Sequence, residues 1–280
     1  MVAGSKLGGA TGIVCVAALM LFQAGGSPLA AAARAATTLK YKKGDHPRLW
    51  VGDGRLAKIA KRCAPGGSMH AQYVALKNKV DAELASGRTH LWGAKIAAVG
   101  LCHLVEKHHG RNAEAYLRGL TSVIGMENPQ LDRGRAWQYA TVVDWVWSNL
   151  TAGERTAAAK WLMGDGIHQA WRYRRPTGEP PGRNWYRDDS IAVTHTALTN
   201  IVLWDESIEE ETIRRSVQWL DTYFEKYWKP LWDTIETFPE GWHYFLGRHR
   251  GCHPYCPLAW DEATGRFPNL VKARLLAHLP

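Results

Sequence analysis

The sequence predicts an all-α fold built from antiparallel helical hairpins. Apolar residues recur at helical spacing in successive segments along most of the chain. The period-two alternation typical of half-buried strands is not sustained anywhere. Helices that follow one another through short loops pack as antiparallel pairs. About eight or nine such helices indicate a helical array, and an incomplete or short (α/α) toroid is one way to build it.

The first 35 residues are typical of a secretory signal peptide. Lys6 supplies positive charge, residues 12–22 are apolar, and small residues lead to an Ala-x-Ala cleavage site at 33–35. The apolar run is shorter than the ~20 residues that span a bilayer, so we expect no stable membrane insertion after cleavage. The mature chain is therefore predicted to be secreted or periplasmic, with a helical domain over 36–250. Residues 251–280 are expected to form a C-terminal tail or the stump of a further domain.

The helices are predicted in order from residue 53. They cover residues 53–63, 68–86, 90–108, 112–126, 134–149, 151–163, 188–204 and 207–229. Asp53 is expected to cap the first helix, Gly110 to stop the third, and Pro230 to end the last. The segment 90–108 is apolar on most sides, which favours a helix packed on both flanks.

Two capping-box patterns predict helix starts. Thr151 is followed three residues later by Glu154, and Ser207 by Glu210. In this motif the hydroxyl accepts from the backbone of the third residue, whose side chain accepts from the cap residue's own N–H.

Charge and aromatic content indicate an anionic, sugar-like partner. Removing Lys6 and Arg34, the charged residues of the signal segment, takes the formal charge from +9 to +7. Cations alternate with acids over most of the chain, which disfavours a nucleic-acid partner. All 14 Trp lie between Trp50 and Trp260; most are core residues, and some are candidates to stack on sugar rings.

No metal or cofactor site is predicted. Cys252 and Cys256, beside His249 and His253, lack the usual C-x-x-C spacing, so a disulfide or free thiols are favoured. Residues 103–109 (HLVEKHH) match neither common zinc-protease pattern, and histidines near a helix C-terminus suit the helix dipole. The loop 172–187 is rich in Arg, Pro and Gly, and its guanidinium groups suit carboxylates or sulfates.

Several segments resemble heparinase II/III-like and alginate lyases. Residues 142–155 (VVDWVWSNLTAGER) resemble a helix ending in D-W-[LV]-[YW] that leads into an L-[ST]-x-x-E-R helix start. Residues 46–49 (HPRL) resemble the family's entry into its α/α toroid, 183–185 (RNW) its Asn-containing loop, and 239–244 (PEGWHY) its P-[DE]-G turn. The resemblance covers about residues 46–250, mainly through the order and spacing of these motifs.

The resemblance implies β-elimination on a uronate-containing acidic polysaccharide, without a cofactor. It makes Asn184 the group that neutralises the substrate carboxylate, and Tyr244 the general base and acid, with Tyr255 as a rival and His243 as an assistant. The residues expected to bind substrate are Arg183, Arg187, Trp185, Trp242 and His249.

The chain departs from the family pattern in two places. Trp185 stands where many alginate-type relatives have His, and residues 251–280 are too few to be the β-sheet domain that usually follows the toroid. Two alternatives therefore stay open. One is a toroid that binds acidic glycan without cleaving it. The other is an α/α-ring glycoside hydrolase that uses carboxylates such as Asp144, Asp188 or Glu240.

Overall fold

The computed structural model describes residues 37–52, 54–86, 94–124, 136–167, 188–228 and 252–266. All regular structure in these ranges is helical, which confirms the all-α class. The elements are α2 (Arg55–Cys63), α3 (His70–Ala85), α4 (Ala94–His108), α5 (Glu114–Ile124), α6 (Ala136–Val146), η2 (Trp147–Asn149), α7 (Ala152–Trp161), η3 (Leu162–Ile167), α9 (Asp188–Leu203), α10 (Glu210–Tyr223), η4 (Phe224–Trp228) and α12 (Cys252–Thr264). None of these helices combines the length and apolar character that a membrane span requires.

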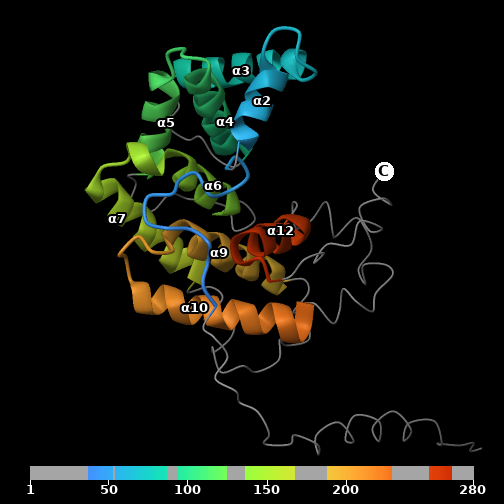
Figure 1. Cartoon of the computed structure of the whole chain (residues 1–280). Helices are drawn as coiled ribbons and strands as arrows, with labels where there is room; N and C mark the ends of the chain where they lie inside the picture. The colour runs from blue at the N-terminus through green and yellow to red at the C-terminus, as the bar shows by residue number, and fades with distance from the viewer. Residues whose placement is uncertain are drawn as a thin grey trace, which may run out of the picture. The chain divides into compact units, whose positions relative to one another are not determined.

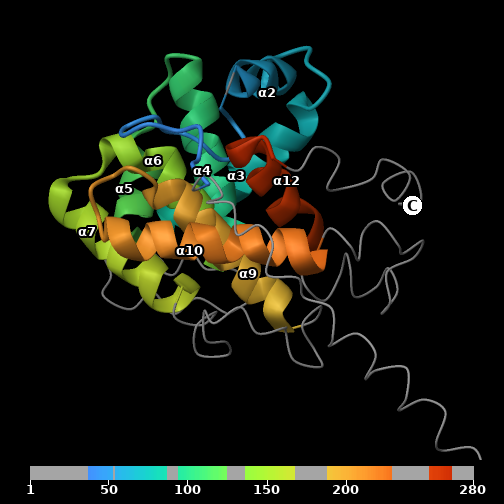
Figure 2. The same cartoon turned by 60° about the horizontal axis from the view of Figure 1, so that its bottom comes forward.

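The helices pack in two series (Figure 1). Helices α4, α6, α9 and α12 each contact the next in this order, and α3, α5 and α7 form a second series of successive contacts. The two series meet where α4 packs against α3 and α5. Helix α10 packs on α9, beside which it runs in Figure 2.

Helix α6 is the centre of the core. Its apolar side chains Tyr139, Ala140, Val142, Val143 and Val146 are buried on one side, and the polar side chains of Thr141 and Asp144 are buried on the other. This follows from its position between α4 and α9, since a helix covered on two flanks has little surface left in contact with solvent.

Helices α4 and α6 approach each other closely at Gly100. A Cβ atom at this position would lie 2.9 Å from Cε3 of Trp145 and 3.2 Å from Cγ2 of Val142. The backbone φ of Gly100 is not in the left-handed region, so its conformation does not require glycine. The close packing of the two helices does, because it leaves no room for a side chain.

One predicted capping box is confirmed and the other is wrong. Thr151 caps α7: its Oγ1 accepts from the Glu154 amide at 3.3 Å, and the Glu154 carboxylate accepts from the Thr151 amide at 2.7 Å. Helix α10 instead starts after Glu209, which has a left-handed φ of 46° and gives no side-chain cap. Ser207 Oγ accepts from Lys43 Nζ at 2.9 Å, so a contact distant in sequence replaces the local cap.

The end of α4 agrees with the sequence prediction. Gly110 has a left-handed φ of 69°, and the Arg111 amide donates to the Glu106 carbonyl at 2.9 Å, as in a Schellman motif. Helix α2 begins after Gly54, which has a φ of 75°, while Asp53, its expected cap, lies outside the described residues.

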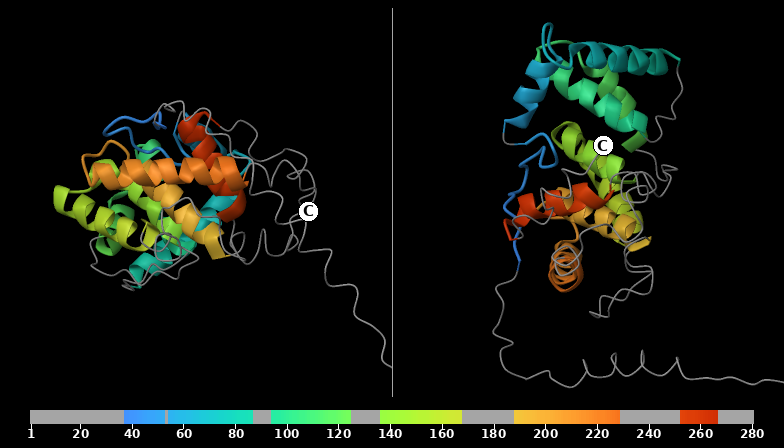
Figure 3. Two further views of the ribbon diagram at one scale, coloured as in Figure 1. Left: turned by 90° about the horizontal axis from the view of Figure 1, so that it is seen from below. Right: turned by 90° about the vertical axis from the view of Figure 1, so that its right-hand side faces the viewer.

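Residues 37–52, here called the N-terminal strap, run across the fold without regular structure. Leu39, Leu49 and Val51 of the strap are buried. The Lys40 amide donates to the carbonyl of Ala263 at 2.9 Å, which attaches the strap to α12. In Figure 3 the strap passes close to both α12 and α6.

We predict that Gly100→Ala lowers the free energy of unfolding by about 1–3 kcal/mol, because the added methyl group overpacks the α4–α6 contact. Gly153→Ala in the first turn of α7 is the matched control. No atom lies within 4 Å of its added Cβ, so it should be neutral or slightly stabilising. Urea unfolding of both variants tests this, and equal effects would contradict the close approach.

Candidate functional site

The predicted catalytic residues lie outside the described part of the chain. Asn184 belongs to residues 168–187, and His243 and Tyr244 belong to residues 229–251. The predicted binding residues Arg183, Trp185, Arg187, Trp242 and His249 lie in the same two segments. The rival Tyr255 is on α12, but its side chain lies outside the described part of the structure. What the structure does define is where the flanking helices end.

Helices α9 and α10 form an antiparallel hairpin joined by residues 204–209. The Asn200 amide nitrogen donates to Ser216 Oγ at 3.0 Å near the turn end of the pair. The start of α9 at Asp188 and the end of η4 at Trp228 are therefore at the opposite, shared end of the hairpin (Figure 2). Residues 168–187 precede the first of these positions and residues 229–251 follow the second.

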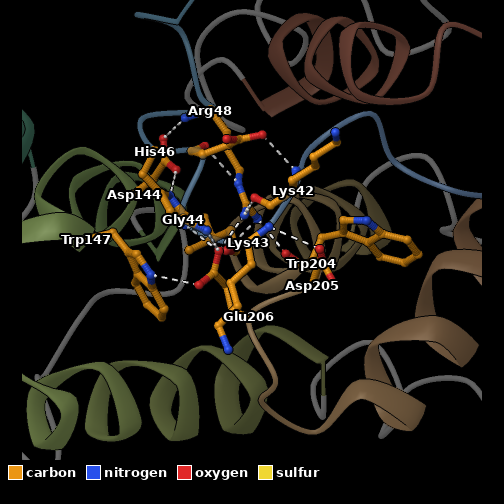
Figure 4. Close-up of polar contacts among 12 residues, drawn as sticks. Lys42, Lys43, Gly44, His46, Arg48, Asp144, Trp147, Trp204, Asp205 and Glu206 are labelled. Carbon is orange, nitrogen blue, oxygen red and sulfur yellow. Dashed lines mark hydrogen bonds and ion pairs between the residues drawn. The ribbon is translucent and has the colours of Figure 1, made fainter.

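Residues 46–49 of the strap and 142–150 of α6 and η2 meet in the interior (Figure 4). Asp144 of α6 accepts from His46 Nδ1 at 2.6 Å through Oδ1. Its Oδ2 accepts from the backbone amides of Arg48 at 2.8 Å and Leu49 at 2.7 Å. The carboxylate thus satisfies two strap amides that would otherwise be buried without a partner.

Arg48 of the strap caps the C-terminus of α9. Its Nη1 donates to the carbonyl oxygens of Ile201 at 2.8 Å, Val202 at 3.1 Å and Trp204 at 2.8 Å. The last carbonyls of a helix have no partner within the helix and carry partial negative charge, so a guanidinium there is favourable. Its other N–H groups donate to strap carbonyls and to Glu206.

Glu206, in the α9–α10 turn, is the second carboxylate of the network. One oxygen accepts from the Gly44 amide at 2.9 Å, from His46 Nε2 at 3.1 Å and from Arg48, and the other accepts from Trp147 Nε1 at 3.1 Å. Burial favours a higher pKa for Glu206, but the hydrogen bonds from His46 and Gly44 and the charge of Arg48 outweigh it and lower the pKa to about 2.

His46 connects the two carboxylates. Each ring nitrogen faces a carboxylate oxygen, so both contacts are hydrogen bonds only when both nitrogens carry a proton. The ring stacks on Trp147 at a centroid distance of 5.1 Å. Burial lowers the pKa of Arg48 from its ordinary value, although Glu206 and Asp144 oppose this shift.

We call His46, Arg48, Asp144 and Glu206 the strap network. Their side chains are at most 5% exposed, so no substrate reaches them. The network is structural: it joins the strap, α6 and the α9–α10 turn. Asp144 is therefore a poor candidate for a hydrolase carboxylate, because both its oxygens are occupied within the protein.

Near the end of α4, the side chains of Glu106 and His103 both have partners within the protein. Glu106 accepts from Tyr73 at 2.6 Å and from two guanidinium nitrogens of Arg111 at 2.7 Å each. His103 is buried, and its Nδ1 lies 3.3 Å from the Ala113 carbonyl. Among the described residues, no group of three His, Cys, Asp or Glu side chains is placed to hold a metal ion.

Helix α9 carries buried polar side chains that the apolar pattern of the sequence did not reveal. Within the described chain, His195 Nε2 and Asn200 Oδ1 have no hydrogen-bond partner. Burial lowers the pKa of His195 to about 4, so its ring is neutral at physiological pH.

A shallow hollow lies beside the α9–α10 turn, where Arg214 stacks over Trp204 at 5.7 Å. It encloses about 240 Å³ including open solvent, less than the ~300–1,000 Å³ of typical small-molecule sites. The Arg214 guanidinium also pairs with Glu210 at 3.8 Å. The hollow is therefore a weak candidate for a small-molecule site.

Comparison with known proteins finds no protein-family model, curated protein or solved structure that matches this chain. The functional interpretation consequently depends on the residues and contacts described above.

Sequence reasoning missed Glu206 and the capping role of Arg48. Glu206 lies in a short polar turn, where an acidic residue is ordinary. Its partners Gly44, His46 and Arg48 are 158 to 162 residues away, so no local pattern indicates the contact. The only available signal was the HPRL segment, residues 46–49. Its resemblance to an entry segment did not indicate which residues it contacts.

We predict that Glu206 makes the fold sensitive to acid. The unfolded carboxyl titrates near pH 4.5 and the folded one near 2, so its stabilisation is complete above about pH 4.5 and is lost as the pH falls towards 2. The loss should reach about 3 kcal/mol at most. The free energy of unfolding, measured with urea between pH 2 and 7, should fall less steeply at acid pH for Glu206→Gln than for wild type. The exposed control Glu210→Gln should keep the wild-type slope, and an unchanged slope in Glu206→Gln would contradict the network.

We predict that Asp144→Ala lowers the free energy of unfolding by about 3–5 kcal/mol, because it leaves His46 and two buried amides without their acceptor. Asp45→Ala is the control in the same strap. Its carboxylate accepts one exposed bond, from the Lys42 amide at 2.9 Å, and the loss should be about 1 kcal/mol or less. Thermal unfolding followed by circular dichroism compares them. A stable Asp144→Ala would instead agree with a catalytic carboxylate.

Proposed function

We propose that this chain is an exported polysaccharide lyase-like protein that cleaves uronate-containing acidic polysaccharide by β-elimination on an α/α toroid. The observation that carries the proposal is the buried contact of residues 46–49 with Asp144 and Trp147. These are two of the segments through which the chain resembles heparinase II/III-like and alginate lyases, and they are almost 100 residues apart. Two resembling segments that pack against each other support the resemblance more strongly than two segments without a contact.

The packing order supports the toroid part of the proposal. An α/α toroid has an inner and an outer layer of helices, and two such layers would account for the contact series α4–α6–α9–α12 and α3–α5–α7. The two ends of the described chain also meet. Arg55 at the start of α2 makes a bidentate pair with Glu262 of α12, both bonds at 2.8 Å.

The α9–α10 hairpin supports the proposed catalytic pair. Asn184 lies four residues before α9, and Tyr244 lies 16 residues after η4. Both segments are attached at the same end of the hairpin, which is compatible with a cleft that the two side chains share.

The proposed reaction breaks the C4–O glycosidic bond of a uronate. Asn184 hydrogen-bonds the substrate carboxylate and so stabilises the enolate-like transition state. Tyr244 removes the C5 proton, the electron pair forms a C4=C5 double bond, and the departing oxygen is protonated by the Tyr244 hydroxyl, with His243 assisting. Arg183, Arg187 and His249 bind the substrate anions, and Trp185 and Trp242 stack on the sugars.

We predict that purified residues 36–280 raise ultraviolet absorbance at the unsaturated-uronate band when incubated with a panel of acidic polysaccharides. Asn184→Ala and Tyr244→Phe should each lower the rate about 100-fold or more, because each removes a group that acts in the transition state. Asn78→Ala, on an exposed position of α3, is the control and should be silent.

Tyr255→Phe separates the two tyrosines. Loss of activity in Tyr255→Phe but not in Tyr244→Phe would overturn the assignment of the base. No absorbance change on any substrate, from folded protein, would overturn the lyase proposal and favour a non-catalytic glycan-binding toroid.

A further inference from the structure

Helix α2 presents a basic outer face that the strap network does not use. Lys58, Lys61 and Arg62 are exposed, whereas Ala60 and Cys63 on the other side of the helix are buried. Positions three and four residues apart are neighbours on a helix surface, so the three cations lie together.

This face has no acidic residue nearby in the sequence to balance it. No Asp or Glu occurs between Asp53 and Asp81, a stretch that contains six Lys and Arg residues. Like charges at i,i+4, as in Lys58 and Arg62, cost a helix a few tenths of a kcal/mol. Helix stability therefore does not explain the composition of this face.

The tertiary structure leaves the three cations uncompensated as well. Arg55, on the same helix, is paired with Glu262 of α12. Within the described chain, the side chains of Lys58 and Lys61 make no hydrogen bond or ion pair. Arg62 donates from Nε to Ser68 Oγ at 3.2 Å, a neutral partner that holds the guanidinium at the end of the helix.

We infer that the outer face of α2 (Lys58, Lys61 and Arg62) is an anchoring surface for an acidic polysaccharide, separate from the proposed catalytic segments. A chain with a carboxylate or sulfate on successive sugars complements cations clustered on one face, and a guanidinium binds either group in bidentate fashion. The choice of a glycan rests on the proposed function, whereas the uncompensated charge does not depend on it.

The packing of α2 disfavours a membrane as the partner. A helix that lies in a membrane surface inserts its apolar side, but Ala60 and Cys63 are buried in the protein and Ile59 packs against the core. The exposed side of α2 is mainly charged, and it suits binding to a polyanion without insertion.

The anchoring surface is on α2, whereas the proposed catalytic segments adjoin the α9–α10 hairpin in the sequence. Within the described unit, α2 and the α9–α10 hairpin lie at opposite ends (Figures 1 and 3). A long polysaccharide would reach both, and the second contact would act at high effective concentration. A short oligosaccharide would engage the proposed site alone.

The test measures binding of residues 36–280 to immobilised heparin and to polygalacturonate over a range of salt concentrations. We expect the triple variant Lys58→Gln, Lys61→Gln, Arg62→Gln to bind about tenfold more weakly or worse. Its affinity should also depend less steeply on salt, because fewer counterions are released. Its unfolding midpoint should not fall, since like charges are removed.

The matched control is the triple variant Arg118→Gln, Lys160→Gln, Lys226→Gln, which removes the same charge from exposed positions on α5, α7 and η4. Its affinity should stay within about twofold of wild type. Equal weakening of both triple variants would show that net charge alone acts, and would overturn the anchoring surface. Binding to phosphatidylserine vesicles that depends on α2, without such dependence for either glycan, would overturn the choice of partner.

A second arm separates this inference from the proposed function. Binding that depends on α2 but without elimination in wild type would contradict the lyase proposal and retain the anchoring surface. The α2 triple variant could instead cleave long chains and short oligosaccharides at the wild-type rate and bind glycan with unchanged affinity. This outcome would support the lyase proposal and overturn the anchoring surface.

Discussion

The strap network is the constraint on which the rest of the fold depends. Two carboxylates, Asp144 and Glu206, are buried with a guanidinium and an imidazole. Each buried charge is costly unless it is paired and hydrogen-bonded, so the network is stable only when all its members are in place. It therefore couples three parts of the chain that share no local structure: the strap, α6 and the α9–α10 turn.

This coupling also holds the α9–α10 hairpin at its turn. Arg48 holds the C-terminal carbonyls of α9, and Glu206 holds the turn that reverses the chain into α10. With the turn held, the free end of the hairpin is directed by helix packing on α6 and α12. In the sequence, the segment that carries Asn184 ends where α9 begins, and the segment that carries Tyr244 begins where η4 ends. Side chains are held more precisely when the elements that carry or flank them are rigid.

The two kinds of charge in this protein have different roles. Inside, cations and acids are matched, and the low pKa of Glu206 reflects how completely its oxygens are used. Within the part of the chain that the structure describes, Arg55 is the one cation of α2 with an acidic partner. Buried charges must be compensated within the protein, whereas exposed charges are screened by water and salt and remain available to bind another molecule. For binding a partner, the uncompensated cations of α2 therefore matter more than the net charge of the whole chain.

The sequence by itself determined the helical class, most helix positions and the α7 cap, because these depend on side-chain periodicity and on contacts within four residues. The predicted segments 68–86, 112–126 and 188–204 correspond to α3, α5 and α9 within about two residues. Only the tertiary structure decided the start of α10, where Lys43 engages Ser207 from 164 residues away. It likewise decided the role of Glu206, since long-range hydrogen bonds leave no periodic trace in the sequence.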